Sequence, residues 1–143
     1  MTIQILIPVM LITVLFEPVY ANETKSSRWY NQLQVDKGRF IYEKNCLVCH
    51  GIKAQGITED WKQTLEDGSY PPPPLNGSAH AWHHPLKMLI HTINNGGAPI
   101  GGKMPAFKEK LNLKEKLAVI AYFQNFWDVE KYNAWLRRGG LDF

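Results

Sequence analysis

Two cysteines and a histidine stand together in the run Cys46-Leu47-Val48-Cys49-His50. A Cys-x-x-Cys-His run is the attachment signature of c-type haem, in which each thiol forms a thioether with the macrocycle. The histidine that follows is then held at the iron as an axial ligand. The spacing therefore predicts one covalently bound haem c, attached at Cys46 and Cys49, with His50 as the first protein ligand of the iron.

Two other chemistries use paired cysteines. A thioredoxin-like redox site is expected beside a strand, helix, strand pattern, and the sequence shows no such pattern. A zinc site needs a second ligand pair, whereas the chain contains only two cysteines. Neither chemistry explains His50, so haem attachment is the favoured interpretation.

A second candidate ligand is Met104, which lies in a loop rich in glycine and is followed by Pro105. A thioether sulfur favours ferrous iron, so His/Met coordination raises the reduction potential. Glycines let a loop approach a flat cofactor closely, and proline stiffens it. Met88 is the rival, but it falls in the middle of a predicted helix. Met104 is therefore the predicted sixth ligand, against the alternative that it only fills the core.

The residues around the haem motif show a family resemblance. Gly38, Tyr42 and Cys46 fall four residues apart, and Met-Pro follows far downstream in GGKMPAF. Residues 35–127 resemble the class I mono-haem c-type cytochromes. The resemblance implies an all-α cytochrome c fold, in which the helix carrying Gly38 crosses a C-terminal helix and both pack around one haem.

The same resemblance assigns two further roles. The segment PPPPLNG is similar to the Pro-x-Leu-x-Gly element of the family, which implies that the carbonyl of Pro73 accepts a hydrogen bond from the ligand histidine. Such a bond fixes the tautomer of the ring and raises its basicity. The aromatic Tyr122 is expected near Gly38 and Tyr42. The activity implied is one-electron transfer, with iron cycling between the ferrous and ferric states and no bound substrate.

The elements predicted to position these residues are helices. Asp36 is a candidate cap for a helix that ends near Asn45. Pro85 suits the first position of a later helix with an apolar face at every third or fourth residue. Asn112 and Glu115 form a capping-box pair for the last family helix. Thr58 is a candidate start for a short helix in the long stretch that follows the haem motif.

The chain begins with a different kind of sequence. Residues 3–16 are nearly all apolar, and Val19-Tyr20-Ala21 offers small residues at the positions that signal peptidase reads. The predicted organisation is a signal peptide (1–21), a lead segment (22–34), the cytochrome domain (35–127) and a C-terminal extension (128–143). The signal is expected to be cleaved, with an uncleaved membrane anchor as the alternative. Either outcome places the domain in the periplasm, and the extension would wrap the domain or dock a partner.

Composition is ordinary for a globular protein, with 45% hydrophobic and 20% charged residues and a net charge of +3. The sequence has no basic cluster with interleaved aromatics, so nucleic acid is not an expected partner. The predicted partners are redox proteins, with membrane contact only through a partner or an uncleaved signal. Between Lys103 and Lys116 there are five lysines and two glutamates. They would either attract an acidic partner surface or form a solvated helix face.

Two alternative functions stay open at this point. His80, His83 and His84 lie close together in the sequence, and imidazoles with a nearby thioether would suit copper. A copper-handling or assembly-linked cytochrome is therefore the first alternative. The second is a haem sensor or enzyme in which Met104 leaves the iron. Filled axial positions argue against an enzyme, because peroxide or oxygen chemistry needs an open site.

Overall fold

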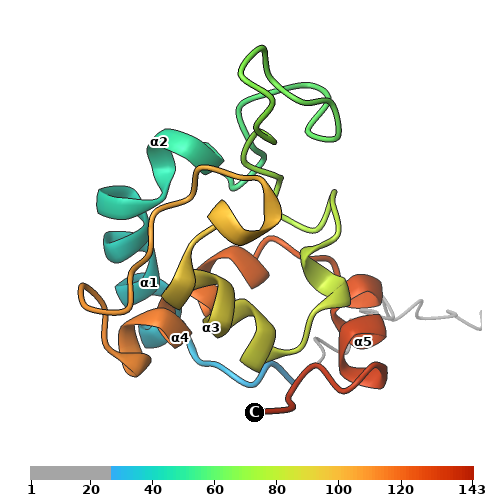
Figure 1. The fold of residues 1–143 in the computed structure, drawn as a ribbon. Helices are drawn as coiled ribbons and strands as arrows, with labels where there is room; N and C mark the ends of the chain where they lie inside the picture. The colour runs from blue at the N-terminus through green and yellow to red at the C-terminus, as the bar shows by residue number, and fades with distance from the viewer. Residues whose placement is uncertain (1–26) are drawn as a thin grey trace, which may run out of the picture.

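The computed structural model describes residues 27–143, and over this range the chain is helical (Figure 1). Strand-like pairing within these residues is limited to one isolated bridge between Tyr70 and Gly102. The predicted all-α class is therefore confirmed. The predicted signal peptide lies outside the described residues. The helical elements, in chain order, are α1 (Gln32–Asn45), α2 (Leu47–His50), η1 (Ala81–His83), α3 (Leu86–Asn95), η2 (Ala98–Ile100), α4 (Leu113–Gln124) and α5 (Val129–Arg137).

The helices α1 and α4 cross in direct contact at Gly38. A Cβ atom placed on Gly38 would lie 1.9 Å from the carbonyl oxygen of Ala118 and 3.0 Å from Cβ of Tyr122. Only glycine therefore permits this approach of the two backbones. One turn further along α1, the ring of Tyr42 packs against that of Tyr122 with centroids 5.0 Å apart. The expected crossing and the expected place of Tyr122 are both confirmed.

The first helix begins earlier than Asp36, so the predicted cap at that residue is wrong. Asn31 is the cap, since its side chain accepts the backbone N–H of Gln34 and the Gln34 side chain accepts that of Asn31. This reciprocal pair satisfies two backbone groups that a helix start leaves free. Asp36 instead lies inside the helix and accepts a hydrogen bond from Gln32. The predicted capping box of Asn112 and Glu115 on α4 is confirmed.

The third helix has the predicted apolar face, with Leu86, Leu89 and Ile93 buried. Pro85 occupies the cap position, one residue before the predicted place, and Gly96 ends the helix with φ of 77°. The short helix predicted at Thr58 is absent from the described residues, where turns take its place. Asp60 accepts the backbone N–H of Lys62 there, a local bond that competes with helix formation.

The C-terminal extension packs on its own domain. Tyr132 and Trp135 of α5 are completely buried. The indole Nε1–H of Trp135 donates to the carbonyl of His84 at 2.9 Å, and the carbonyl of Gly140 accepts the backbone N–H of Leu86 at 2.8 Å. These contacts fix the start of α3, so the extension contributes Tyr132 and Trp135 to the domain core.

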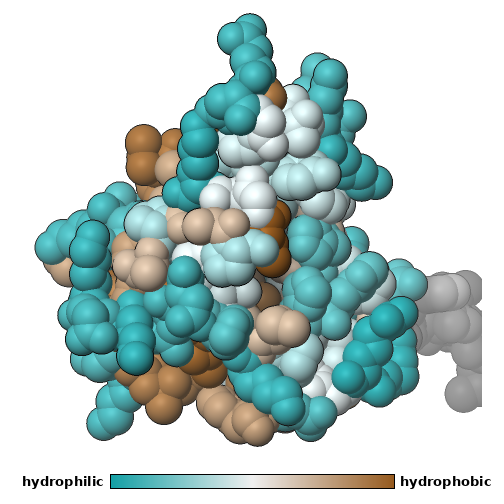
Figure 2. All heavy atoms as spheres, viewed as in Figure 1, coloured by the Kyte–Doolittle hydropathy of each residue, from teal (hydrophilic) through white to brown (hydrophobic). Residues whose placement is uncertain are grey.

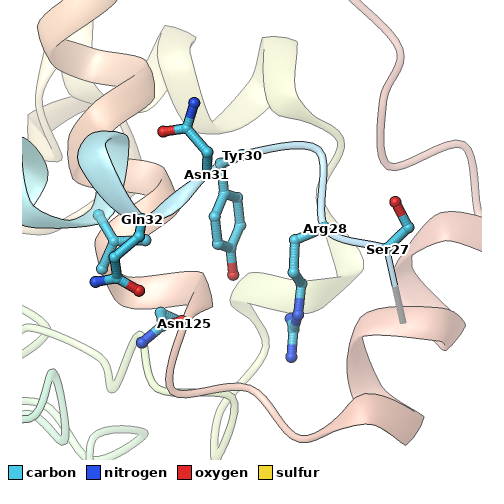
Figure 3. Close-up of a pocket in the computed structure, with 7 residues that line it drawn as sticks. Ser27, Arg28, Tyr30, Asn31, Gln32 and Asn125 are labelled. Carbon is cyan, nitrogen blue, oxygen red and sulfur yellow. The ribbon is translucent and has the colours of Figure 1, made fainter. Parts of the chain in front are cut away.

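The segment before α1 is held by the same region. Arg28 donates to the carbonyl of Trp127 at 2.7 Å, and its guanidinium lies 4.1 Å from the centroid of the Tyr132 ring. Figure 3 shows Arg28 and Tyr30 at a surface pocket that Asn125, just after α4, also lines. Within residues 27–143, no helix combines the length and the apolar character that crossing a membrane requires.

Candidate haem site

The attachment motif forms a single helical turn at the end of α1. The backbone N–H of His50 donates to the carbonyl of Cys46 at 2.9 Å, which closes that turn. Cys46 is partly buried, Cys49 is exposed, and both are free thiols. Burial, reinforced by Cys49, raises the pKa of Cys46 to about 11. The two cysteines thus share one helical turn with a histidine that is 7% exposed.

The orientation of His50 is fixed by Pro73. The ring atom Nδ1 lies 3.0 Å from the carbonyl oxygen of Pro73. Because a carbonyl can only accept, Nδ1 carries the hydrogen and Nε2 keeps a free lone pair in the neutral ring. Burial lowers the pKa of His50, while the bond to Pro73 opposes that shift. The contact is the one that the family resemblance implied, and it prepares Nε2 for metal coordination.

The proline segment is held from two sides. The carbonyl of Ala54 accepts the backbone N–H of Leu75 at 2.7 Å. On the other side, the indole Nε1–H of Trp127 donates to the carbonyl of Leu75, also at 2.7 Å. Trp127 therefore supports the segment that orients His50. Sequence reasoning did not find this role, because 52 residues separate the two partners and no motif links them.

Met104 is partly buried and packs against the hydrophobic core. The backbone N–H of Gly97 donates to the Met104 carbonyl at 2.9 Å. A Cβ on Gly96 would lie 2.4 Å from that same oxygen, so the glycines permit a close approach. Within the protein, the backbone that they admit is that of Met104 itself. The rival Met88 has 46% of its surface exposed on α3.

The chemistry of these donors fits haem c. Two free thiols flank a buried neutral imidazole, and a half-buried thioether supplies the soft donor that low-spin haem iron accepts. Cys46 and Met104 both belong to a set of partly buried apolar residues that pack against the core. That set also includes Leu47, Leu75, Trp82 and Ile90.

The histidine cluster has a different character from the one predicted. The ring of Trp61 stacks on His80 with centroids 4.8 Å apart, and the rings of His80 and His84 meet edge to face at 5.4 Å. In the part of the chain that the structure covers, no three His, Cys, Asp or Glu residues are arranged to hold a metal ion. The copper site considered for His80, His83 and His84 stays a prediction that these contacts do not support.

A helical domain with a free Cys-x-x-Cys-His turn and an oriented histidine has the architecture of a c-type cytochrome. The profile of the family described as "Cytochrome C oxidase, cbb3-type, subunit III" matches residues 33–123, and the chain belongs to this family. Its cofactor is covalently bound haem c. The match covers α1 to α4 and ends before α5.

Two curated relatives carry the description "Cbb3-type cytochrome c oxidase subunit CcoP". The protein from Azospirillum brasilense is 32% identical over 90 residues, which cover 63% of this chain and 28% of the relative. The protein from Azospirillum sp. (strain B510) is 32% identical over 92 residues, or 64% of this chain and 28% of the relative. The chain thus matches little more than a quarter of each relative's length. No solved structure matches the chain.

Proposed function

We propose that this domain transfers single electrons as the cytochrome subunit of a larger oxidoreductase, with its haem domain in the periplasm. When bound, haem c supplies an iron that cycles between the ferrous and ferric states. Cys46 and Cys49 would hold the macrocycle through thioethers, and His50 and Met104 would be the protein ligands of the iron. The relatives described as oxidase subunits support the assignment to an assembly.

The observation that carries the proposal is the bond between Nδ1 of His50 and the Pro73 carbonyl. It holds the imidazole in one orientation and one tautomer, so the ring need not rearrange when the charge at the metal changes. With His50 and Met104 both bound to the iron, no coordination site would be left open for oxygen or peroxide, which favours electron transfer over catalysis.

The ligand set is tested by the absorption spectrum of the purified ferric protein. Sulfur bound to low-spin haem iron gives a weak far-red band, which we expect in the native protein. Met104→Ala should abolish the band, and Met88→Ala should retain it because Met88 is exposed. High-spin iron without the band in the native protein would instead favour a sensor or an enzyme with an open site.

The assembly is tested separately. A tagged chain is expressed in its native host, and detergent-solubilised membranes and the soluble fraction are both purified on the tag. We expect the chain to recover with oxidoreductase subunits from the membranes. Recovery of the chain alone from the soluble periplasmic fraction would show a free electron carrier instead.

We further propose that an acidic partner surface docks near Met104. Among the five lysines from Lys103 to Lys116, the candidates for this docking surface are the exposed Lys108, Lys110 and Lys114. Lys103 is paired with Asp67, and Lys116 is buried with its ammonium 3.4 Å from the Lys108 carbonyl. Charge reversal at Lys108 and Lys110 should lower the rate at which the partner reduces this domain. It should also weaken the dependence of that rate on salt concentration.

A further inference from the structure

A projecting loop contacts the segment that leads to Met104. Residues 53–70 follow the haem motif and stand out from the body of the domain above η2 (Figure 1). Its outer surface is largely hydrophilic (Figure 2). Neither the haem attachment nor the His50 contacts account for a loop of this length.

The end of the loop forms two contacts with that segment. The backbone N–H of Tyr70 donates to the carbonyl of Gly101 at 2.9 Å, and Tyr70 and Gly102 form a parallel bridge. Asp67 forms an ion pair with Lys103, the residue directly before Met104. One contact is a backbone hydrogen bond and the other is ionic, so they can be removed independently.

A turn over residues 65–69 holds the end of the loop in the position that these contacts require. Asp67 accepts both the backbone N–H and the hydroxyl of Ser69, and the carbonyl of Ser69 accepts the N–H of Leu65 at 2.8 Å. Lys103 and then Ser69 hold the pKa of Asp67 well below its ordinary value, so the carboxylate stays charged near neutral pH. Asp67 therefore faces Lys103 from a closed turn.

The segment that it contacts has few other fixed points. Residues after Met104 are anchored on the end of α3, where the carbonyl of Ile93 accepts the N–H of Phe107 at 2.9 Å. Residues before Met104 turn back on Gly97, which bonds both Gly102 and Met104. Within that turn, the loop contacts at Gly101 and Lys103 add further restraints on the N-terminal side of the ligand.

From this arrangement we infer that residues 65–70 form a strap that positions Met104, with Asp67 and the Tyr70 backbone as positioning groups. The inference rests on the proposed ligation of iron by Met104. The strap holds residues 101–103 in place, so it opposes the movement that would carry the sulfur away from its position. It should therefore control the rate at which Met104 is exchanged for an external ligand.

The test measures exchange of Met104 for imidazole in the ferric holoprotein by stopped flow, at imidazole concentrations where the rate is limited by release of the methionine. Tyr70→Pro removes the N–H donor and should raise the release rate by about three- to ten-fold. Tyr70→Ala also loses the ring but keeps the N–H, so it serves as the matched control and should stay near the native rate.

The ion pair is tested by charge exchange. Asp67→Lys should raise the release rate by about two- to five-fold, as expected for a pair whose side chains are 48% and 66% exposed. The double variant Asp67→Lys with Lys103→Asp restores the pair but not the bonds of Asp67 to Ser69, so it should return part of the way to the native rate. Both positions are on the surface, so these variants are expected to fold, and far-ultraviolet circular dichroism checks this.

Release rates within two-fold of native in Tyr70→Pro and Asp67→Lys, with the far-red band retained, would overturn the strap while leaving Met104 as the ligand. Absence of the band from the native protein would overturn Met104 ligation and the strap together. A faster release in Asp67→Lys that the double variant fails to reverse would also count against a direct pair with Lys103.

Discussion

Replacement of Gly38 by alanine tests the helix crossing on which the domain depends. The added Cβ would lie 1.9 Å from the Ala118 carbonyl oxygen, whereas ordinary contact begins at 3.4 Å, so the two backbones would have to separate by 3.4 − 1.9 = 1.5 Å. Overpacking of this kind costs about 1–3 kcal/mol, and a main-chain obstacle places it near the upper end. Alanine recovers about 1 kcal/mol through helix propensity. The expected net loss is about 2 kcal/mol.

The assay is urea unfolding of the ferric holoprotein, followed by tryptophan fluorescence. With a urea slope of about 1.5 kcal/mol per molar, the midpoint should fall by about 1 M or slightly more. Lys37→Ala, on the exposed side of the same helix, should change stability by no more than about 0.5 kcal/mol.

A second-site variant separates this cause from side-chain crowding. Ala118→Gly in the Gly38→Ala background removes a methyl group but leaves the obstructing carbonyl oxygen in place. It should therefore fail to restore stability. If Gly38→Ala is as stable as the native protein, or more stable by the gain of about 1 kcal/mol in helix propensity, close packing of the two helices does not require glycine at this position.

Three further variants test other parts of the domain by urea unfolding. Trp127→Phe leaves the Leu75 carbonyl without its indole donor and should cost about 1–3 kcal/mol; an unchanged midpoint would show that the bond contributes nothing. Asn112→Ala removes the cap of α4 and should cost about 1 kcal/mol, whereas Asn112→Asp, which keeps an acceptor, should cost much less. Burial raises the pKa of Tyr30 from 10.0 to about 12, so the unfolded chain loses that proton first. The stability from Tyr30 is complete below about pH 10 and is lost as the pH rises toward 12, so Tyr30→Phe should flatten this decline.

Local features of the site could be predicted from the sequence. The haem motif spans only five residues, since both thioethers and one ligand must reach the same macrocycle, and such spacing is readable directly. The capping box at Asn112 and the apolar face of α3 are also set by short-range geometry. By contrast, the helix start at Asp36 was predicted wrongly, because the stronger pair of Asn31 and Gln34 lies one turn earlier.

The histidine cluster shows why proximity in sequence is insufficient for a metal site. His80, His83 and His84 lie within five positions, yet their rings pack against Trp61, Trp82 and each other. A coordination site needs convergent lone pairs, which depends on the rotamer and backbone of each residue. The turn at η1 directs the rings into aromatic contacts, and that outcome carries no signature in the sequence.

The sequence by itself indicated the cofactor and the candidate ligands through covalent spacing and motifs. Its resemblance to the c-type cytochromes implied the all-α class and the bond of His50 to Pro73. The tertiary structure alone decided how the segments around these ligands are supported. The bond from Trp127 to Leu75 and that from Trp135 to His84 join residues 52 and 51 positions apart. The ion pair of Asp67 with Lys103 joins residues 36 positions apart. Contacts at such separations arise only when the folded core brings the segments together, so no local pattern in the chain encodes them.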